Sequence, residues 1–167
     1  MSKEEILPQV RELLGSIGQR PITPDLQFWL EQTYPPGEPF FETLAALFRK
    51  GIHEGWACPA EIAGSGYRRG RIFDPSPLTF DFSVESALVT DRIGQHHRHP
   101  RGEINMIVPI DAAAQFCGCG RGWNVYPPGS EHFPTVTGGA AAMLYFLPNG
   151  ELEFTGRSPD ISASASV

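Results

Sequence analysis

The sequence of 167 residues predicts a mainly β domain, a sandwich or a barrel, that follows a helical segment. After about Trp56, short apolar runs are separated by Gly and Pro at roughly eight to twelve positions, which is typical of all-β folds. No helical pattern alternates with these runs, so the βαβ units of a parallel sheet are not expected. The length allows one domain, which we divide into a helical segment (1–55), a β-barrel domain (56–156) and a loose tail (157–167).

Three helices are expected before residue 55. Between Ile6 and Ile17 apolar residues recur at helical spacing, and Gly18 follows where a helix would end. Thr23 precedes Pro24, which is typical of an N-cap followed by proline in the first turn. A third apolar stripe comes after a Pro/Gly turn and consists of Phe40, Phe41, Leu44, Leu47 and Phe48.

Strand candidates occupy the remainder of the domain. Residues 79–84 alternate polar and apolar side chains, as a half-buried strand does. Residues 104–110, 122–126 and 140–147 are further candidates. The arginine-rich run 68–71 is interpreted as a solvated turn, with the alternative that one of its arginines binds a substrate carboxylate.

Composition limits the partners. Thirteen Lys and Arg against nineteen Asp and Glu give a formal charge of −6, which argues against nucleic acid or an anionic membrane as the main partner. No signal peptide or membrane span is expected, and three cysteines give no disulfide framework, so a cytoplasmic location is predicted. A small molecule is therefore the expected partner.

Two separated segments supply four potential metal ligands. His97 and His99 are two residues apart, so on a strand both point to the same face, whereas His96 points to the opposite, solvated face. A bend then leads to Glu103, and the turn at residues 127–132 adds His132. Three imidazoles and one carboxylate suit a borderline divalent metal ion, and coordination positions left open would indicate catalysis.

These two segments resemble the two motifs of the cupin superfamily. Residues 97–103 (HRHPRGE) resemble the first motif, HxH followed by Glu, and residues 127–132 (PPGSEH) resemble the PxGxxH of the second. The resemblance implies a single cupin barrel, a double-stranded β-helix or jelly roll, with an N-terminal helical segment. It also implies one divalent metal ion, of Fe, Mn, Zn, Ni or Co, held by His97, His99, Glu103 and His132.

A narrower resemblance covers most of the chain, from about residue 5 to 155. The helical segment, a lone barrel, and the stretch 122–136 together resemble the 4-hydroxylaminobenzoate lyase family. That family converts 4-hydroxylaminobenzoate to 3,4-dihydroxybenzoate and ammonia in nitroaromatic breakdown. The resemblance implies a small aromatic acid as substrate and catalytic roles for Glu103 and His99. The substrate-binding candidates are Arg71 or Arg92 for the carboxylate, and Phe82, Trp123 and Tyr126 for the ring.

Two other functions stay open on sequence alone. An Fe(II)-dependent cupin dioxygenase acting on a catechol- or thiol-like substrate would use the same ligand set, but would consume oxygen. A non-catalytic cupin that binds a small molecule would bind aromatic acids without forming product. In each case we expect a homodimer, because barrels with appended elements often associate symmetrically.

Overall fold

The computed structural model describes residues 2–62 and 66–159. The helices are α1 (Leu7–Ile17), α2 (Pro24–Thr33) and α3 (Pro39–Glu54), with 3-10 helices η1 (Lys3–Ile6) and η2 (Pro77–Thr79). The strands are β1 (Ala60–Glu61), β2 (Tyr67–Phe73), β3 (Phe82–Ile93), β4 (His97–His99), β5 (Glu103–Pro109), β6 (Gln115–Phe116), β7 (Gly122–Tyr126), β8 (Ser130–His132), β9 (Thr135–Pro148) and β10 (Glu153–Phe154). No described helix combines the length and apolar character needed to cross a membrane.

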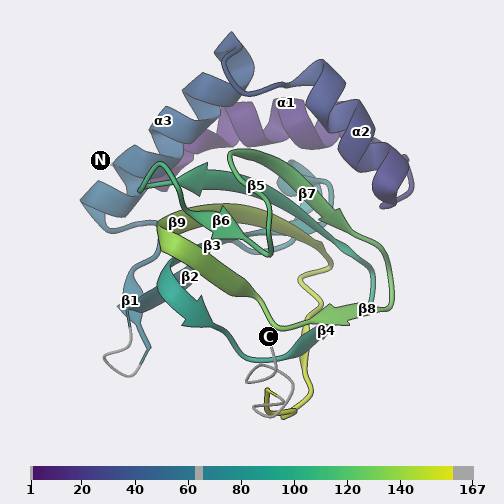
Figure 1. Cartoon of the computed structure of the whole chain (residues 1–167). Helices are drawn as coiled ribbons and strands as arrows, with labels where there is room; N and C mark the ends of the chain where they lie inside the picture. The colour runs from purple at the N-terminus through teal and green to yellow at the C-terminus, as the bar shows by residue number, and fades with distance from the viewer. Residues whose placement is uncertain (1, 63–65, 160–167) are drawn as a thin grey trace.

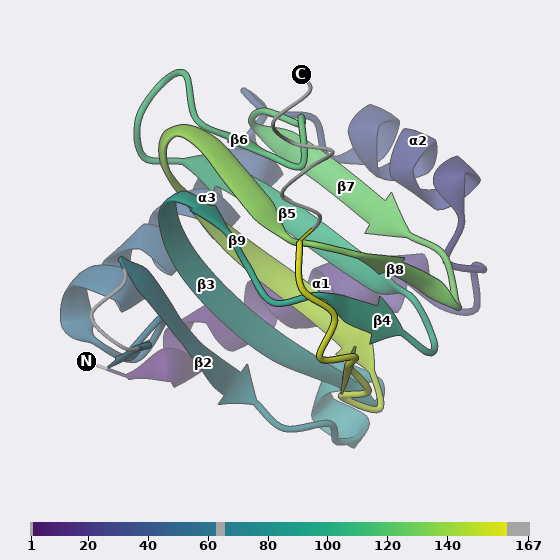
Figure 2. The same ribbon diagram turned by 60° about the horizontal axis from the view of Figure 1, so that its bottom comes forward.

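The strands form two antiparallel sheets. The larger sheet has the order β1-β2-β3-β9-β5-β7, with β6 paired to β9, and the smaller has the order β10-β4-β8. The three helices lie together over one face of the larger sheet, while β4 and β8 lie across its other face (Figure 1). Figure 2 shows that the long strands β3 and β9 curve toward β4 and β8 and so enclose the interior of a barrel. The expected mainly β fold with an N-terminal helical segment is confirmed, as a single barrel of the jelly-roll type.

The helices begin and end at the signals seen in the sequence. Thr23 is extended and precedes Pro24, the first residue of α2. Helix α3 ends at Gly55, whose φ of +87° lies in the left-handed region that favours glycine. The N–H of Gly55 donates to the carbonyl of Gly51 and so satisfies one of the free carbonyls at the end of α3.

The larger sheet has an apolar core on each face. On β5, Ile104 and Met106 belong to the core that packs against the helices, together with Phe48 of α3. The alternating residue Ile107 belongs to a smaller core on the other face, inside the barrel. Because both faces are covered, β5 is buried along almost its whole length. The helices therefore stabilise the sheet by covering one face of it, and the candidate site lies on the other face, inside the barrel.

Two segments differ from the predicted elements. Residues 79–81 are not strand, because Thr79 ends η2 and the positive φ angles of Phe80 (+53°) and Asp81 (+63°) make a turn before β3. The prediction of a strand from residue 79 is therefore wrong at its start. The arginine-rich run 68–71 is not a turn but the middle of β2, paired with β3. At residues 79–81, the alternation of polar and apolar side chains did not distinguish a capped turn from a strand. In run 68–71, the high charge suggested a solvated turn, although the run lies on a strand near the edge of the sheet.

Candidate metal centre and adjoining cavity

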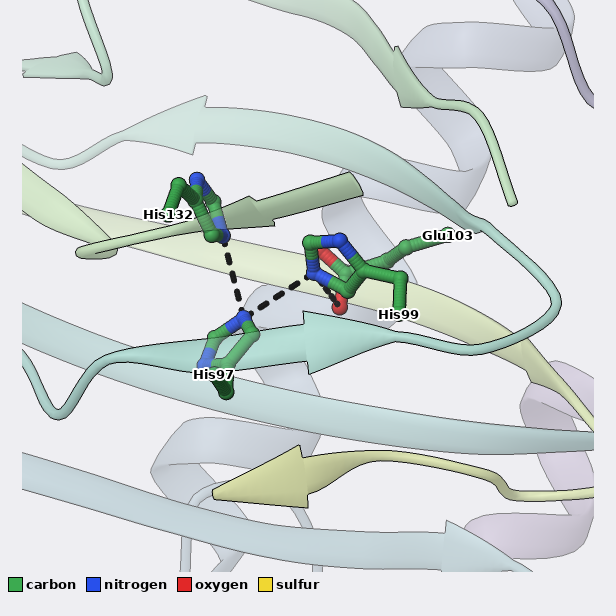
Figure 3. A group of neighbouring side chains, drawn as sticks. All are labelled: His97, His99, Glu103 and His132. Atoms are coloured by element: carbon green, nitrogen blue, oxygen red, sulfur yellow. Dashed lines mark hydrogen bonds and ion pairs between the residues drawn. The ribbon is translucent and has the colours of Figure 1, made fainter. Parts of the chain in front are cut away.

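The candidate ligands come from three strands that meet inside the barrel. Strands β4 and β8 pair antiparallel, with His97 opposite His132 and His99 opposite Ser130. His97 and His99 are buried and the residue between them is exposed, as the period of two requires. Glu103 is buried at the start of β5, and its carboxylate points toward the three imidazoles (Figure 3). The structure thus brings together all four ligands expected from the sequence.

The spacing of the four donor atoms fits one cation. His97 Nε2 lies 3.0 Å from both His99 Nε2 and His132 Nε2, and His99 Nε2 lies 3.3 Å from Glu103 Oε2. An ion about 2.1 Å from each donor would hold donors at right angles roughly 3.0 Å apart. Hydrogen bonds alone do not explain the cluster, because a single hydrogen on His97 Nε2 cannot serve both neighbouring nitrogens. These side chains fit a divalent metal ion.

The protonation states also suit metal binding. Burial lowers the pKa of His97 to about 4 and that of His132 to about 3, so both imidazoles are neutral at pH 7. For Glu103, burial opposes ionisation, but the adjacent His99 and the hydrogen bond from Asn105 favour the anion, and its pKa is lowered. His97 and His132 therefore present neutral nitrogens and Glu103 an anionic oxygen, the forms that bind a cation.

Hydrogen bonds outside the cluster orient two of the ligands. The Ser130 hydroxyl donates to the carbonyl of Pro127 (2.6 Å), so its oxygen is left to accept from His99 Nδ1 (3.0 Å). This places the ring hydrogen of His99 on Nδ1 and leaves the Nε2 lone pair facing the other ligands. The amide of Asn105 donates to Glu103 Oε1 (2.7 Å) and fixes the carboxylate.

Nδ1 of His132, the ring nitrogen that faces away from the other candidate ligands, lies next to a thiol rather than a hydroxyl. Cys117 Sγ lies 3.6 Å from His132 Nδ1, while the Tyr126 ring packs against His132 and stacks on His99 at 5.2 Å and 21°. The structure thus places the Cys117 thiol in contact with a candidate ligand. Burial raises the pKa of this thiol, so it stays protonated at neutral pH.

His96 points away from the ligand cluster, as its position next to His97 requires. Its predicted exposure to solvent is nevertheless wrong, because the side chain is buried. The ring packs on Phe133, and Nδ1 lies 2.6 Å from the hydroxyl of Thr155. The cover comes from Phe133 and from the segment after β9, both distant in the sequence, and strand alternation carries no information about it.

A cavity opens beside His97 and Glu103 inside the barrel. Its walls are mainly apolar and include Ala87, Val89, Phe116, Val136, Met143 and Phe154. Polar side chains lie at a few points of the wall, namely Tyr67, Arg69, Arg92, Asn105 and Tyr145. Such a mixture of apolar wall and few polar groups is typical of a site for a small organic molecule.

The structure places the five predicted substrate-binding residues differently from one another. Arg92 lines the cavity, and Tyr126 contacts the candidate ligands. Arg71 points elsewhere and forms ion pairs with Glu85 (2.6 Å) and Asp74 (3.2 Å).

Phe82 and Trp123 pack with the core beneath the helices, where the Trp123 indole donates to the carbonyl of Tyr34 (2.8 Å). Trp123 is three residues from Tyr126 on the same strand, so its alternation already indicated the opposite face. Arg69 also lines the cavity, and the sequence indicated it only as one of the arginines in run 68–71. Tyr145 lines the cavity as well and was given no individual role. For Arg69, the period of two along β2 from Tyr67 was the available signal, once β2 is recognised as a strand.

Comparison of the sequence with known protein families shows which family this chain belongs to. Residues 8–154 match the family described as PnbB, 4-hydroxylaminobenzoate lyase. The chain belongs to the 4-hydroxylaminobenzoate lyase family. A relative in this family, the 4-hydroxylaminobenzoate lyase of Nocardioides sp. (strain LMS-CY), is 38% identical over 149 residues, which covers 84% of this chain and 88% of that protein. The 4-hydroxylaminobenzoate lyase of Pseudomonas putida is 30% identical over 167 residues, covering 91% and 95%.

Solved structures similar to this member of the lyase family include an oxalate oxidase and an RmlC-like cupin protein. An oxalate oxidase is 19% identical and covers 63% of this chain and 68% of its own, with a TM-score of 0.42. An RmlC-like cupin from Ralstonia eutropha is 11% identical and covers 53% and 59%, with a TM-score of 0.41.

Proposed function

We propose that the protein is a metal-dependent lyase that converts 4-hydroxylaminobenzoate to 3,4-dihydroxybenzoate and ammonia. The observation that carries the proposal is a three-histidine, one-glutamate cluster opening on a mainly apolar cavity, in a chain of this family. The reaction is balanced by one water molecule. Cleavage of the N–O bond of the substrate supplies the oxidation of the ring, so no external oxidant is needed.

The metal ion is part of the proposal. His97, His99, Glu103 and His132 would hold it, and Fe, Mn, Zn, Ni and Co all accept this ligand set. When bound, such an ion supplies Lewis acidity toward the hydroxylamino oxygen or toward a water molecule.

The protein's own residues would perform the remaining tasks. Glu103 lines the cavity, and if the metal ion holds its carboxylate only loosely, that carboxylate would accept or return a proton while water adds to the ring and ammonia leaves. Asn105 holds the other oxygen of Glu103, and Ser130 holds His99, so both proposed catalytic groups keep their orientation. The apolar walls would keep bulk water from the activated ring.

An anaerobic assay tests the proposed reaction. Protein loaded separately with each of the candidate metals is incubated with 4-hydroxylaminobenzoate, and ammonia and 3,4-dihydroxybenzoate are measured. We expect equal amounts of both products without oxygen. Oxygen uptake during turnover would instead support the dioxygenase, and tight binding without product would support a binding protein. Failure with every metal would remove the lyase assignment.

The ligand assignment has a separate test. His97→Ala and His132→Ala each remove one of the converging nitrogens, so we expect both variants to lose most of their metal and their turnover. His96→Gln is the matched control, because His96 is buried nearby but points away from the cluster. Elemental analysis of the purified variants gives the result. Full metal content in both alanine variants would contradict the assignment.

A further inference from the structure

Strand β2 carries three arginines, and their surroundings differ. Arg68 donates to the carbonyls of Cys58 (3.0 Å) and Pro59 (3.1 Å), and Arg71 is paired with two carboxylates. The Arg69 side chain forms no hydrogen bond or ion pair with any residue that the structure describes, and its guanidinium lies over the Phe154 ring at 5.5 Å. It is half-buried and lines the cavity. A guanidinium keeps five N–H donors, and in an apolar wall they need an acceptor.

The position of Arg69 relative to the candidate ligands suits a short aromatic acid. In the larger sheet β2 and β5 are separated by β3 and β9, which places Arg69 three strand spacings, about 14 Å, from β5. Through Ala87 and Met143, Arg69 is in register with Ile107, four residues along β5 from Glu103. The curvature of the barrel shortens this path through the interior. The Phe154 ring packs near both groups, 6.1 Å from the His97 ring and 5.5 Å from Arg69 Cζ.

The wall between Arg69 and the ligands leaves room for a ring. Arg69 is paired in register with Ala87, and Ala87 with Met143, so a small and a flexible side chain follow Arg69 across the sheet. Both line the cavity. An aromatic ring placed here would meet apolar atoms on its faces, with a cation at one end and the imidazole and carboxylate cluster at the other.

We propose that Arg69 binds the carboxylate of the aromatic substrate and makes the protein selective for aromatic acids over neutral aromatic compounds. The identity of the acid rests on the proposed lyase function, whereas the anion subsite rests on the geometry of Arg69. Planar guanidinium and carboxylate groups form two parallel charge-assisted hydrogen bonds, which gives both affinity and orientation. Bound in this way, a para-substituted benzoate directs its other end toward His97 and Glu103.

Arg92 is the competing candidate, since it also lines the cavity. Its guanidinium stands 6.0 Å from the Tyr67 ring, and it follows the irregularity in β3 after Thr90. The experiment must therefore compare the two arginines directly.

The test uses an unreactive ligand pair, so that it does not depend on turnover. Metal-loaded protein is titrated calorimetrically with 4-aminobenzoate and with 4-aminobenzamide, which has the same ring but no negative charge. We expect wild type to prefer the acid, and Arg69→Gln to bind the acid about ten- to hundredfold more weakly with amide binding unchanged. Arg69→Lys, which keeps the charge without the planar fork, should fall between them.

Control variants separate this effect from a general change in the barrel. Arg68→Gln, one residue away on β2 and outside the cavity, should leave the binding of both ligands unchanged. Thermal unfolding of each variant identifies any loss of folded protein, and Arg69→Lys supplies the comparison if Arg69→Gln is unstable. In the lyase assay, Arg69→Gln should raise KM more than it lowers kcat.

Three results would overturn the proposal. These are binding of the amide by wild type as tight as binding of the acid, an unchanged preference for the acid in Arg69→Gln, and loss of that preference in Arg92→Gln alone. Failure of the lyase function gives a different pattern. In that case acid binding still depends on Arg69, but 4-hydroxylaminobenzoate yields no ammonia.

Discussion

The hydroxyl of Ser130 determines which nitrogen of His99 faces the other ligands. Because this hydroxyl donates to Pro127, it must accept from His99, and the imidazole is held in a single tautomer. We expect Ser130→Ala to weaken metal retention about 10- to 100-fold, as loss of such a partner does in other metal sites. Competition with a chelator measures this, and Ser130→Thr, which keeps the hydroxyl, is the control. Equal retention by Ser130→Ala would show that the tautomer is fixed in another way.

The two histidines with lowered pKa values make the metal-free protein sensitive to acid. An unfolded chain has ordinary imidazoles near pH 6.5, whereas in the folded chain the pKa of His97 is about 4 and that of His132 about 3. Below about pH 6.5 the unfolded chain therefore binds protons that the folded chain does not, and stability falls. We expect a loss of about 1 to 2 kcal/mol for each histidine between pH 7 and pH 5.

Urea unfolding of the metal-free protein at both pH values measures this loss. A double variant, His97→Gln with His132→Gln, removes the two titrating groups and should show a clearly shallower dependence on pH. If the double variant follows the wild-type curve, other groups control the acid sensitivity.

At the scale of elements, the turn between β4 and β5 places Glu103 against the imidazoles. Gly102 in this turn has φ of +91°, and a Cβ there would lie 2.9 Å from the carbonyl oxygen of Tyr126 and 2.8 Å from Ile22 Cγ2. Gly37 has the same φ with nothing within 4 Å of such a Cβ, so it is a matched control for backbone strain alone.

We expect Gly37→Ala to cost about 1 to 3 kcal/mol of unfolding free energy, the usual range for a left-handed residue with a side chain. Gly102→Ala should cost more and should also weaken metal binding, because relief of the two close contacts displaces Glu103. Chemical denaturation and chelator competition measure the two effects. Unchanged metal binding in Gly102→Ala would mean that the turn adapts without moving Glu103.

Alternation along strands explains what could be predicted of the site. Two positions separate His97 from His99, and this local fact already placed both on one face. The cavity wall is different, because it is assembled from β2, β3 and β9 and from the segment after β9. Alternation along β2 places Arg69 on the same face as Tyr67, but the pairing with Ala87 that puts this face inside the barrel is a relationship between strands that the sequence does not contain.

At the scale of the whole molecule, stability and function occupy opposite faces of one sheet. Phe48 of α3 is fully buried in the core beneath the helices, whereas Phe28 of α2 is 64% exposed. We expect Phe48→Ala to lower the unfolding free energy by about 3 to 5 kcal/mol. Phe28→Ala should change it by less than about 0.5 kcal/mol.

Thermal unfolding gives the stability of both variants, and elemental analysis at low temperature gives their metal content. Phe48→Ala should keep its metal while folded, because the sheet separates Phe48 from the ligands. Loss of metal from folded Phe48→Ala would contradict this separation. The helical segment was predictable from its apolar spacing and its Gly and Pro signals, but the face of the sheet that it covers was not. The expected homodimer stays a prediction, which sedimentation analysis would check.

The two-residue strand β10 has a practical consequence for anyone preparing this protein. It pairs with β4 only through Glu153 and Phe154, yet the segment around it contributes Leu152 and Phe154 to the cavity wall and Thr155 to His96. A chain that ends at Gly150 would keep every candidate ligand but would lack Leu152 and Phe154, which line one side of the cavity. Affinity tags are therefore better placed at the amino end, where the nearby helices lie on the face of the sheet opposite the candidate site.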